Sequence, residues 1–297
     1  MPAPGSTREE APAADLPLLE ADLPLPEADL PLLEANLPLL EERHDDVVLL
    51  LLNRPDQRNC LSEGLIGALQ TAIDRVSHDR SVHAVVIAGN GPAFSSGHDL
   101  KEMTARRADA DGGRAYYAHM MDLCARMMLS IVRSPKPFIA AVEGVASAAG
   151  CQLVATCDLA VAGEQARFAT PGVNIGLFCS TPMVALSRNV SRKRAMEMLL
   201  LGEMLGAAEA ADYGLVNRVV PAGTACDAAL AMARRIASKS PATVAVGKAA
   251  FYRQLEAPLA VAYADAADVM VRNMMLRDAA EGIGAFIEKR RPDWKGC

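Results

Sequence analysis

Four short apolar runs alternate with longer amphipathic segments between residues 46 and 163. The runs are DVVLLLLN (46–53), HAVVIAGNG (83–91), PFIAAVEG (137–144) and LAVAG (159–163). Apolar runs of this length that end in turn residues are typical of buried strands. The segments between them carry apolar residues at helical spacing, and Ser62 is a candidate N-cap for the first of these. Because strands that alternate with helices are joined by parallel crossovers, the sequence predicts an α/β layer fold.

The pattern changes to helices after residue 180. Helical segments are predicted at TPMVALSRNV (181–190), SRKRAMEMLLLG (191–202) and AAEAADYG (207–214). A short strand is expected at LVNRVV (215–220), and three more helices between Thr224 and Arg291. Pro182 suits the first turn of a helix, so Thr181 is expected to cap it. The last third of the chain is therefore predicted to be mostly helical.

Size, charge and cysteine content bound the class of protein. At 297 residues, the chain can form one large domain or two modest ones. Its uncharged apolar runs fall far short of the roughly 20 residues that a membrane span requires. Seven cysteines without a CxxC pair favour reduced thiols and indicate neither a disulfide nor a metal site. The N-terminus lacks a secretory core and is too acidic for a mitochondrial presequence, so the expected location is cytoplasmic. Only 4% of the residues are aromatic and no basic stripe runs among them, so no nucleic-acid partner is expected.

Residues 14–41 form four copies of a seven-residue repeat, ADLPLLE, ADLPLPE, ADLPLLE and ANLPLLE. A heptad suggests a coiled coil, but the proline in every copy removes a helix hydrogen bond and costs about 3 kcal/mol. Residues 1–46 also hold twelve acidic and two basic side chains, whereas the remaining residues carry a net charge of +4. We therefore expect residues 1–45 to be a disordered acidic tail whose removal leaves the thermal stability unchanged. A docking peptide with leucine contacts is the alternative.

Three motifs, in order, carry a resemblance to a known family. They are FSSGHDLKEM (94–103), PKPFIAAVEGVASAAGCQLVATCDLAVAGEQARFATPGVNIG (135–176) and EGIGAFIEKRRPDW (281–294). These stretches resemble the crotonase (enoyl-CoA hydratase/isomerase) superfamily, and the resemblance extends over roughly residues 46–294. It implies a ββα spiral core at 46–222 and a helical trimerisation region at 223–297. It also implies assembly as a homotrimer or as a dimer of trimers.

The resemblance further implies that two backbone N–H groups stabilise an oxyanion or enolate on an acyl-CoA thioester. By motif, the donors are His98, which follows the glycine of SSGHD, and Ala149, in the middle of AAG. The small residues 146–150 fit this role, because they let a thioester carbonyl approach a helix N-terminus, where the dipole favours negative charge. Preorganised donors of this kind are worth roughly 3–4 kcal/mol each in acyl chemistry.

Both glutamates that the resemblance assigns to hydratases are replaced in this chain. The first position is occupied by Gln152 and the second by Gly172. A glutamine does not accept a proton near neutral pH and a glycine has no side chain. A general-base contribution of about 10² to 10⁴ is therefore expected to be lost at each position. Ordinary hydration of an enoyl-CoA is disfavoured.

Other titratable residues could replace the two glutamates. His98 is the leading candidate, because a histidine titrates near physiological pH and this one adjoins an inferred oxyanion donor. Glu143, just before the second motif's small residues, is a weaker candidate. Asp99 and Asp158 are expected to cap helices or to pair locally.

Two cysteines and two hydroxyl residues could line an acyl pocket. A nucleophilic thiolate needs a lowered pKa and a base partner, and the sequence shows no such partner for Cys151 or Cys179. Ser180 and Thr181 are expected to form a helix cap, with contact to an acyl group as the alternative.

Four residues are candidates for binding the CoA part of a thioester, and no separate cofactor and no metal is expected. By the resemblance, Lys101, Phe286 and Lys289 lie at the adenine and the 3′-phosphate, the last two from a neighbouring subunit. A lysine suits a phosphate as a point charge. Asp56 follows the NRP motif where a basic residue is usual, which leaves Arg58 as the nearest compensating charge. Solvated surface side chains are the alternative.

Three functions remain open from the sequence. The first is an enzyme that uses the oxyanion hole on an acyl-CoA without the glutamate pair, such as an isomerase, a decarboxylase or a thioester hydrolase. The second is an acyl-CoA-binding protein with little or no catalysis. The third is a residual hydratase in which Gln152 positions a water.

Overall fold

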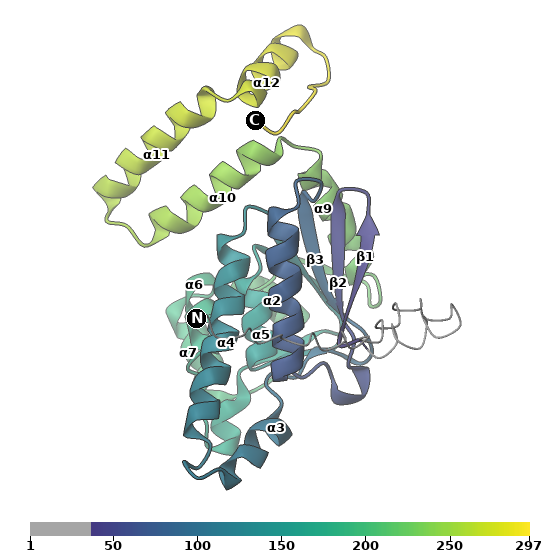
Figure 1. Cartoon of the computed structure of the whole chain (residues 1–297), viewed down its shortest axis with the longest axis vertical. Helices are drawn as coiled ribbons and strands as arrows, with labels where there is room; N and C mark the ends of the chain where they lie inside the picture. Colours follow the sequence, from purple (N-terminus) through teal and green to yellow (C-terminus); the bar gives the residue numbers. More distant parts are fainter. Residues whose placement is uncertain (1–36) are drawn as a thin grey trace, which may run out of the picture. The chain divides into compact units, whose positions relative to one another are not determined.

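A six-stranded sheet forms the centre of the structure, a computed structural model that describes residues 37–297 (Figure 1). Its strands, in spatial order, are β1 (Leu39–His44), β2 (Val47–Leu52), β3 (Ala84–Gly89), β5 (Phe138–Val142), β7 (Leu159–Gly163) and β10 (Arg218–Val220). All neighbouring strands are parallel except β1 and β2. The four strands predicted from the apolar runs are confirmed, as is the α/β class.

Helices cover both faces of this sheet. The helices α2 (Glu63–His78), α4 (Arg114–Arg133) and α5 (Ala149–Thr156) share one apolar core, and α9 (Ala225–Ala237) packs on the opposite face. Side chains alternate between the two cores, since Val85 and Ile87 face the first and Val86 faces the second. Ser62 caps α2 as predicted, because its hydroxyl accepts a hydrogen bond from Leu65 N at 3.2 Å.

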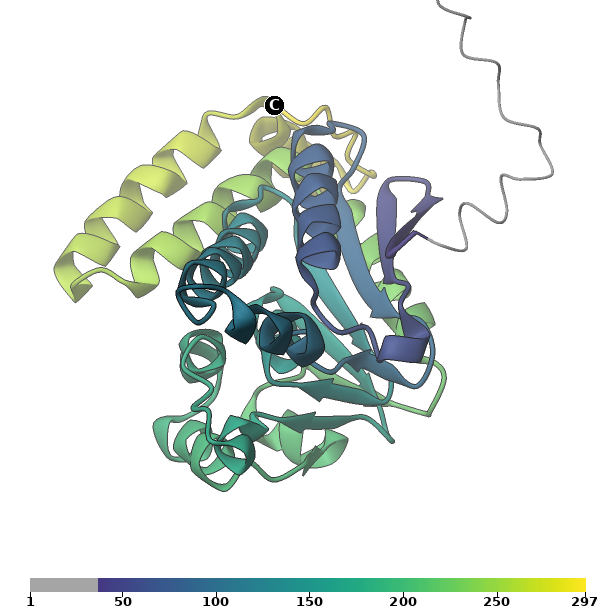
Figure 2. The ribbon, with the colours of Figure 1, turned by 60° about the horizontal axis from the view of Figure 1, so that its bottom comes forward.

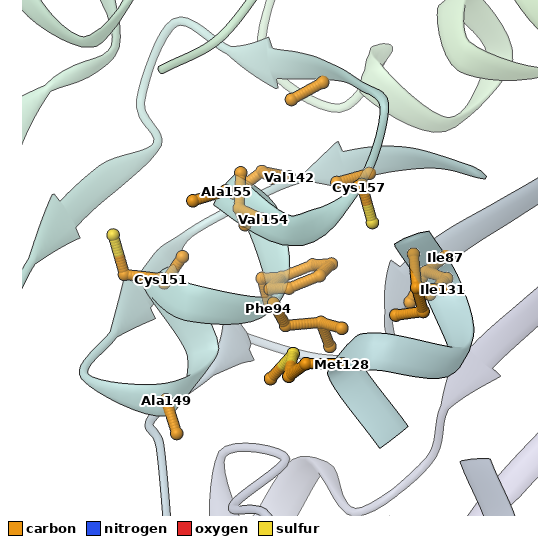
Figure 3. Packing of buried hydrophobic residues seen from close by; sticks show 14 of the residues in the cluster. Ile87, Phe94, Met128, Ile131, Val142, Ala149, Cys151, Val154, Ala155 and Cys157 are labelled. Carbon is orange, nitrogen blue, oxygen red and sulfur yellow. The ribbon is translucent and has the colours of Figure 1, made fainter. Parts of the chain in front are cut away.

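A second, smaller sheet holds the segments that form the candidate site. Its strands are β4 (Ala93–Ser95), β6 (Val145–Ser147), β8 (Arg167–Ala169) and β9 (Leu205–Gly206). Phe94 of β4 is fully buried between Val154 of α5 and Met128 of α4 (Figure 3). Burying an aromatic side chain of this size stabilises the fold by about 1.5–3 kcal/mol, so it fixes β4 against α5.

The other helices before α9 lie in the connections between the strands. They are α3 (Leu100–Ala105), α6 (Pro182–Asn189), α7 (Arg192–Leu201) and α8 (Ala207–Tyr213), with short 3₁₀ turns η1 (Pro55–Gln57), η2 (Arg106–Ala108) and η3 (Pro171–Ile175). The predicted helices in 181–214 are confirmed. Thr181 does occupy the N-cap position of α6, but its side chain forms no capping hydrogen bond, so that prediction of a cap was wrong.

Four helices, not the predicted three, follow Thr224. After α9 come α10 (Pro241–Leu255), α11 (Leu259–Met274) and α12 (Arg277–Glu288), and α10 and α11 lie side by side away from the two sheets (Figure 2). Pro241 and Pro258 mark the additional boundaries, because a proline is tolerated only at a helix start. The helix α9 packs on the main sheet, and residues 37–297 form one compact unit. The helical region expected at 223–297 is present, and its role in trimerisation stays a prediction.

The expected tail boundary at residue 45 also differs from the structure. Residues 39–44, within the last copy of the repeat and just after it, form β1 and pair with the whole of β2, from Leu39 opposite Leu52 to His44 opposite Val47. Residues 1–36 lie outside the described part of the chain, so the expectation of disorder there stays a prediction. The proline periodicity misled the prediction at 39–44, because Pro38 stands before the strand and leaves its hydrogen bonds intact.

Removal of residues 1–45 is therefore expected to destabilise the protein. A chain that begins at residue 46 should lose about 2 kcal/mol of unfolding free energy relative to one that begins at residue 37, because β2 loses its antiparallel partner. For a chain of this size, that loss corresponds to a melting temperature lower by about 4–8 °C. Differential scanning calorimetry on the two chains checks this, and equal melting temperatures would show that β1 contributes nothing.

Candidate functional site

The loop between β4 and α3 carries His98, and the segment around Leu61 holds it on both sides. Leu61 N donates a hydrogen bond to Gly97 O at 2.7 Å, and Asp99 N donates to Leu61 O at 3.3 Å. In a parallel pairing, the residue between two such bonds directs its own N–H away from the partner strand. His98 N donates no hydrogen bond to any of the residues described.

The start of α5 supplies a second free N–H group. Ala148 N donates to Ala169 O at 2.9 Å, and Gln152 N donates to Ala148 O at 3.0 Å, which fixes the first turn of the helix. Ala149 N has no acceptor in the described part of the chain, as is usual for the first N–H groups of a helix. Ala148 has a φ of +49°, a conformation that costs a non-glycine residue about 1–3 kcal/mol and is concentrated at functional sites.

Two glycines allow these segments to touch. A Cβ atom on Gly97, whose φ is +91°, would lie 2.9 Å from Ala148 Cβ and 3.2 Å from Ala149 N. A Cβ atom on Gly150 would lie 2.3 Å from Ser95 O. The His98 peptide, which directly follows Gly97, is therefore next to the N-terminus of α5. The small residues between 146 and 150 are required by this close approach of two backbones.

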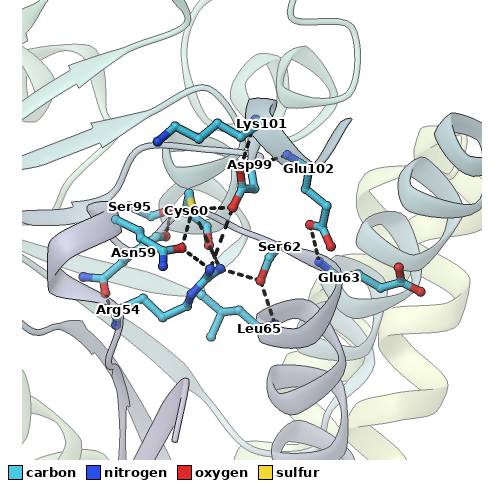
Figure 4. A network of polar contacts seen from close by, with 11 residues as sticks. Arg54, Asn59, Cys60, Ser62, Glu63, Leu65, Ser95, Asp99, Lys101 and Glu102 are labelled. Carbon is cyan, nitrogen blue, oxygen red and sulfur yellow. Dashed lines mark hydrogen bonds and ion pairs between the residues drawn. The ribbon is translucent and has the colours of Figure 1, made fainter. Parts of the chain in front are cut away.

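A polar network behind the loop keeps it in place (Figure 4). Asp99 caps α3 by accepting from Lys101 N at 3.1 Å and Glu102 N at 3.2 Å. Its other oxygen accepts from Cys60 Sγ at 3.2 Å and lies 3.8 Å from Arg54 Nη2. Burial and the Asp99 hydrogen bond raise the pKa of Cys60 to about 11. The thiol is thus a structural donor, and the predicted capping role of Asp99 is confirmed.

Arg54 connects the network to the start of α2. Its Nη1 donates to Ser62 Oγ at 2.5 Å and to Cys60 O at 3.3 Å. Sequence reasoning missed Arg54 and Cys60 as site residues. Their roles depend on contacts with Asp99, which lies 45 residues after Arg54 and 39 residues after Cys60, and no local spacing indicates such contacts.

Gln152 and Gly172 have different surroundings. Gln152 follows Ala149 by three residues, so the two residues lie on the same side of α5. The Gln152 residue is only 6% exposed. Its side-chain oxygen has no hydrogen-bond partner among the described residues. A Cβ atom on Gly172 would lie 2.5 Å from Leu177 O and 2.9 Å from Cys179 Sγ. Gly172 N also donates to Cys179 Sγ at 3.4 Å. A side chain at residue 172, a carboxylate included, would therefore clash with Leu177 and Cys179 in the present arrangement.

The His98 imidazole is largely removed from water. Neither ring nitrogen has a hydrogen-bond partner within residues 37–297. Burial lowers the pKa of His98 below its usual value, and the Leu61 main chain opposes that shift only in part. The ring is therefore neutral at pH 7, with one ring nitrogen protonated and the other unprotonated.

This histidine predicts a loss of stability in mild acid. Below pH of about 6.5 the unfolded chain takes up a proton at His98 that the folded chain does not, so stability falls as the pH drops from 7 to 5. Urea unfolding midpoints at the two pH values should differ less in His98→Gln than in the wild type. His78→Gln, at an exposed position on α2, serves as the matched control. An unchanged pH dependence in His98→Gln would contradict a buried neutral ring.

The other sequence candidates have structural contacts. Glu143 Oε1 accepts from Ala225 N at 3.0 Å and so caps α9 on the far face of the main sheet. Asp158 binds Phe138 N, Lys248 and Tyr252, which confirms local pairing. Burial raises the pKa of Cys151 to about 12 and also raises that of Cys179. Ser180 Oγ donates to Phe178 O at 3.3 Å rather than capping α6.

The four CoA candidates fall into two groups. Arg58 and Lys101 are both exposed on the segments that flank His98, and Arg58 O accepts from Ser96 N at 3.0 Å. Phe286, which is 85% exposed, belongs to α12, and Lys289 is the C-cap residue of that helix. The helix α12 lies far from α3 in the same chain (Figure 1). One chain therefore does not bring the two groups together. No group of three or more potential metal ligands occurs between residues 37 and 297.

Comparison with known proteins agrees with this geometry. The profile of the enoyl-CoA hydratase/isomerase family matches residues 42–297. The chain therefore belongs to this family, within the crotonase superfamily.

Individual relatives are similar over most of the chain. Human "Enoyl-CoA hydratase domain-containing protein 3, mitochondrial" is 47% identical over 250 residues, 84% of this chain and 81% of that protein. The "2,3-dehydroadipyl-CoA hydratase" of Escherichia coli K12 is 34% identical over 86% of this chain and 97% of its own length. A crystal structure of an enoyl-CoA hydratase from Mycobacterium smegmatis superposes with a TM-score of 0.82 at 53% identity, over 86% of this chain and 98% of that one.

Two observations bear on location. None of the helices in residues 37–297 is long and apolar enough to span a membrane. The similar human protein is named as mitochondrial, which does not agree with the cytoplasmic location expected from the N-terminal sequence. That expectation rests on residues outside the described part and stays a prediction.

Proposed function

We propose that this protein binds an acyl-CoA and stabilises negative charge on its thioester oxygen with the N–H groups of His98 and Ala149. One observation carries the proposal, namely that both N–H groups lack an acceptor in the described chain and lie at the contact between Gly97 and the start of α5. Such donors act strongly on a developing oxyanion, because they are fixed before the reaction begins. Lys101 and Arg58 supply positive charge beside the same loop for the phosphates of CoA.

The chemistry we favour does not use a glutamate pair. Gln152 cannot act as a base, and the space around Gly172 excludes a carboxylate. This packing argues against a residual hydratase and leaves enolate chemistry, such as isomerisation or decarboxylation, thioester hydrolysis, or binding alone. The two fixed donors favour an enzyme over a pure binder, because such donors act most strongly on charge that develops during a reaction.

We propose a homotrimer, or a dimer of trimers, as the functional form. The helices α11 and α12 expose large apolar side chains, among them Leu259 (75%), Tyr263 (73%) and Phe286 (85%). Apolar patches of this kind on a water-soluble surface mark contacts with other chains. A neighbouring copy would also bring Phe286 and Lys289 to the Lys101 side of another chain. Light scattering during size-exclusion chromatography tests the assembly.

Two measurements test the proposed function. Mass spectrometry after incubation with a panel of acyl-CoA and enoyl-CoA thioesters detects turnover, and any product rules out a pure binder. Calorimetric titration should show that butyryl-CoA binds roughly tenfold more tightly than S-butyl-CoA, a thioether that lacks the carbonyl, because two hydrogen bonds are made only to the thioester. Equal affinities for the two ligands would contradict the assigned oxyanion hole.

A further inference from the structure

A hollow of about 850 Å³ lies at the end of the main sheet where β3 and β5 begin. His83 and Lys136 precede these two strands, and the start of α10 and residues 292–297 complete the wall. The loop of His98 is reached from the opposite end of β3, a strand of six residues that spans roughly 20 Å. Figure 1 likewise places the start of α10 and α3 at opposite ends. The hollow is therefore separate from the proposed thioester site.

Positive charge is in excess around the hollow. The side chains of Arg80, Lys136 and Lys239 line it, and none of them has an ion-pair partner in residues 37–297. Asp293 is the one acidic side chain of the lining, and it pairs with Lys295 at 2.5 Å. A terminal carboxylate at Cys297 would add one negative charge. The three cations without an ion pair would still exceed it in number.

Two more side chains near the hollow each have a partner already, namely His83 in the lining and Asp79 outside it. His83 Nδ1 lies 3.4 Å from Asp46 Oδ2. Asp79, which acts on Lys136 from outside the lining, accepts hydrogen bonds from Ser81 and lies 3.5 Å from Arg43. Positive charge therefore remains in excess at the hollow, although Asp79 acts on Lys136 from a distance.

Two features distinguish the hollow from a patch of exposed lysines, namely the partial burial of Lys136 and the N-terminus of α10. Lys136 is half-buried, and burial lowers its pKa. An ammonium group that has lost part of its hydration gains more from a bound anion than a fully exposed one. The 15-residue helix α10 also begins here, and the N–H of Ala242 in its first turn has no acceptor in the described residues. Anions bind readily at such a helix N-terminus.

We infer that this hollow binds a small phosphate-bearing organic molecule. A phosphate group matches several converging cations and a helix N-terminus, whereas a single carboxylate would leave positive charge unpaired. The volume exceeds that of an inorganic phosphate and falls in the range of organic ligand sites. Apolar surface is supplied by Pro241, Pro292 and the Trp294 ring. That ring is held in place, since its Nε1 donates to Ser238 O at 3.0 Å.

Calorimetric titration of the full chain with pyrophosphate, ADP and adenosine, at an ionic strength of about 50 mM, tests this inference. We expect pyrophosphate and ADP to bind and adenosine to bind at least tenfold more weakly. Lys136→Gln and Lys239→Gln should each weaken pyrophosphate binding by about tenfold, because each removes a charge-assisted contact. Lys193→Gln, at an exposed lysine of α7, is the matched control and should have no effect. Circular dichroism melts establish that the variants are folded.

ADP is also a fragment of CoA, so the experiment must separate the two sites. Lys101→Gln should weaken binding of butyryl-CoA and leave pyrophosphate binding intact, whereas Lys136→Gln should do the reverse. Absence of pyrophosphate binding to the wild type, or binding that Lys136→Gln does not alter, would overturn the site at the hollow. Neither result bears on the proposed thioester site. A higher affinity for ADP than for pyrophosphate would show that the hollow also recognises the organic part of the ligand. Equal affinities would restrict the ligand to inorganic phosphates and overturn the inference of an organic ligand.

Discussion

Lys248→Met is expected to lower the free energy of unfolding by about 3–5 kcal/mol. The ammonium group of Lys248 donates to Asp158 Oδ2 at 2.7 Å, to Lys136 O at 2.8 Å and to Ile131 O at 2.9 Å. The side chains of Lys248 and Asp158 are only 6% and 15% exposed. Methionine keeps most of the apolar part of the side chain but removes the ammonium donor from two carbonyl groups and from the Asp158 carboxylate. Because Lys248 belongs to α10, its loss also loosens the C-terminal helices.

Urea unfolding measures this effect, and Tyr252→Phe provides the control. Tyr252 OH donates to the other oxygen of Asp158 at 2.8 Å, so phenylalanine removes one neutral donor and keeps the ring. Its expected cost is about 1 kcal/mol. A loss in Lys248→Met no larger than that in Tyr252→Phe would mean that the ion pair does not anchor α10. The double variant Lys248→Met, Asp158→Asn should lose less than the sum of the two single variants, since the partners are coupled.

The main sheet could be predicted from the sequence because its central strands are buried on both faces. Such strands are continuous apolar runs of five or six residues, which stand out from the helices around them. The strands β4, β6 and β8 have three residues each, too few for any periodicity. They exist because each pairs with a segment distant in the sequence. The strand β1 was missed because the proline repeat, which indicates a disordered tail, overlaps it. Pairing with β2 stabilises the strand in spite of this local signal.

The candidate site likewise has features that the sequence predicts and features that only the fold reveals. The small residues before α5 and the glycine before His98 are visible in the sequence, and the family resemblance assigns them a role. The restraint of His98 by Leu61, and the contacts of Asp99 with Arg54 and Cys60, depend on segments that are brought together only in the fold. The missing space at residue 172 is likewise tertiary, because Leu177 and Cys179 fill it. The sequence shows that residue 172 has no carboxylate, and the structure shows that a side chain there would require Leu177 and Cys179 to move.

Gly150→Ala is expected to reduce the affinity for butyryl-CoA at least tenfold and the free energy of unfolding by about 2–3 kcal/mol. Its new methyl group would start 2.3 Å from Ser95 O, so β4 and α5 must move apart. The two segments carry the His98 and Ala149 donors, and oxyanion donors act only when both are correctly placed. If the thioester panel identifies a reaction, its rate should fall by about 10²–10³, the cost of losing one such donor.

Two controls separate this effect from general destabilisation. Gly67→Ala makes the same chemical change within α2, where a Cβ atom would meet no other atom within 4 Å. It should leave binding unchanged and stabilise the helix by about 0.5–1 kcal/mol. Lys248→Met should destabilise the fold more than Gly150→Ala does, yet retain thioester binding at temperatures well below its melting point. If Gly150→Ala bound butyryl-CoA as tightly as Gly67→Ala, the two N–H groups could not be the groups that recognise the thioester.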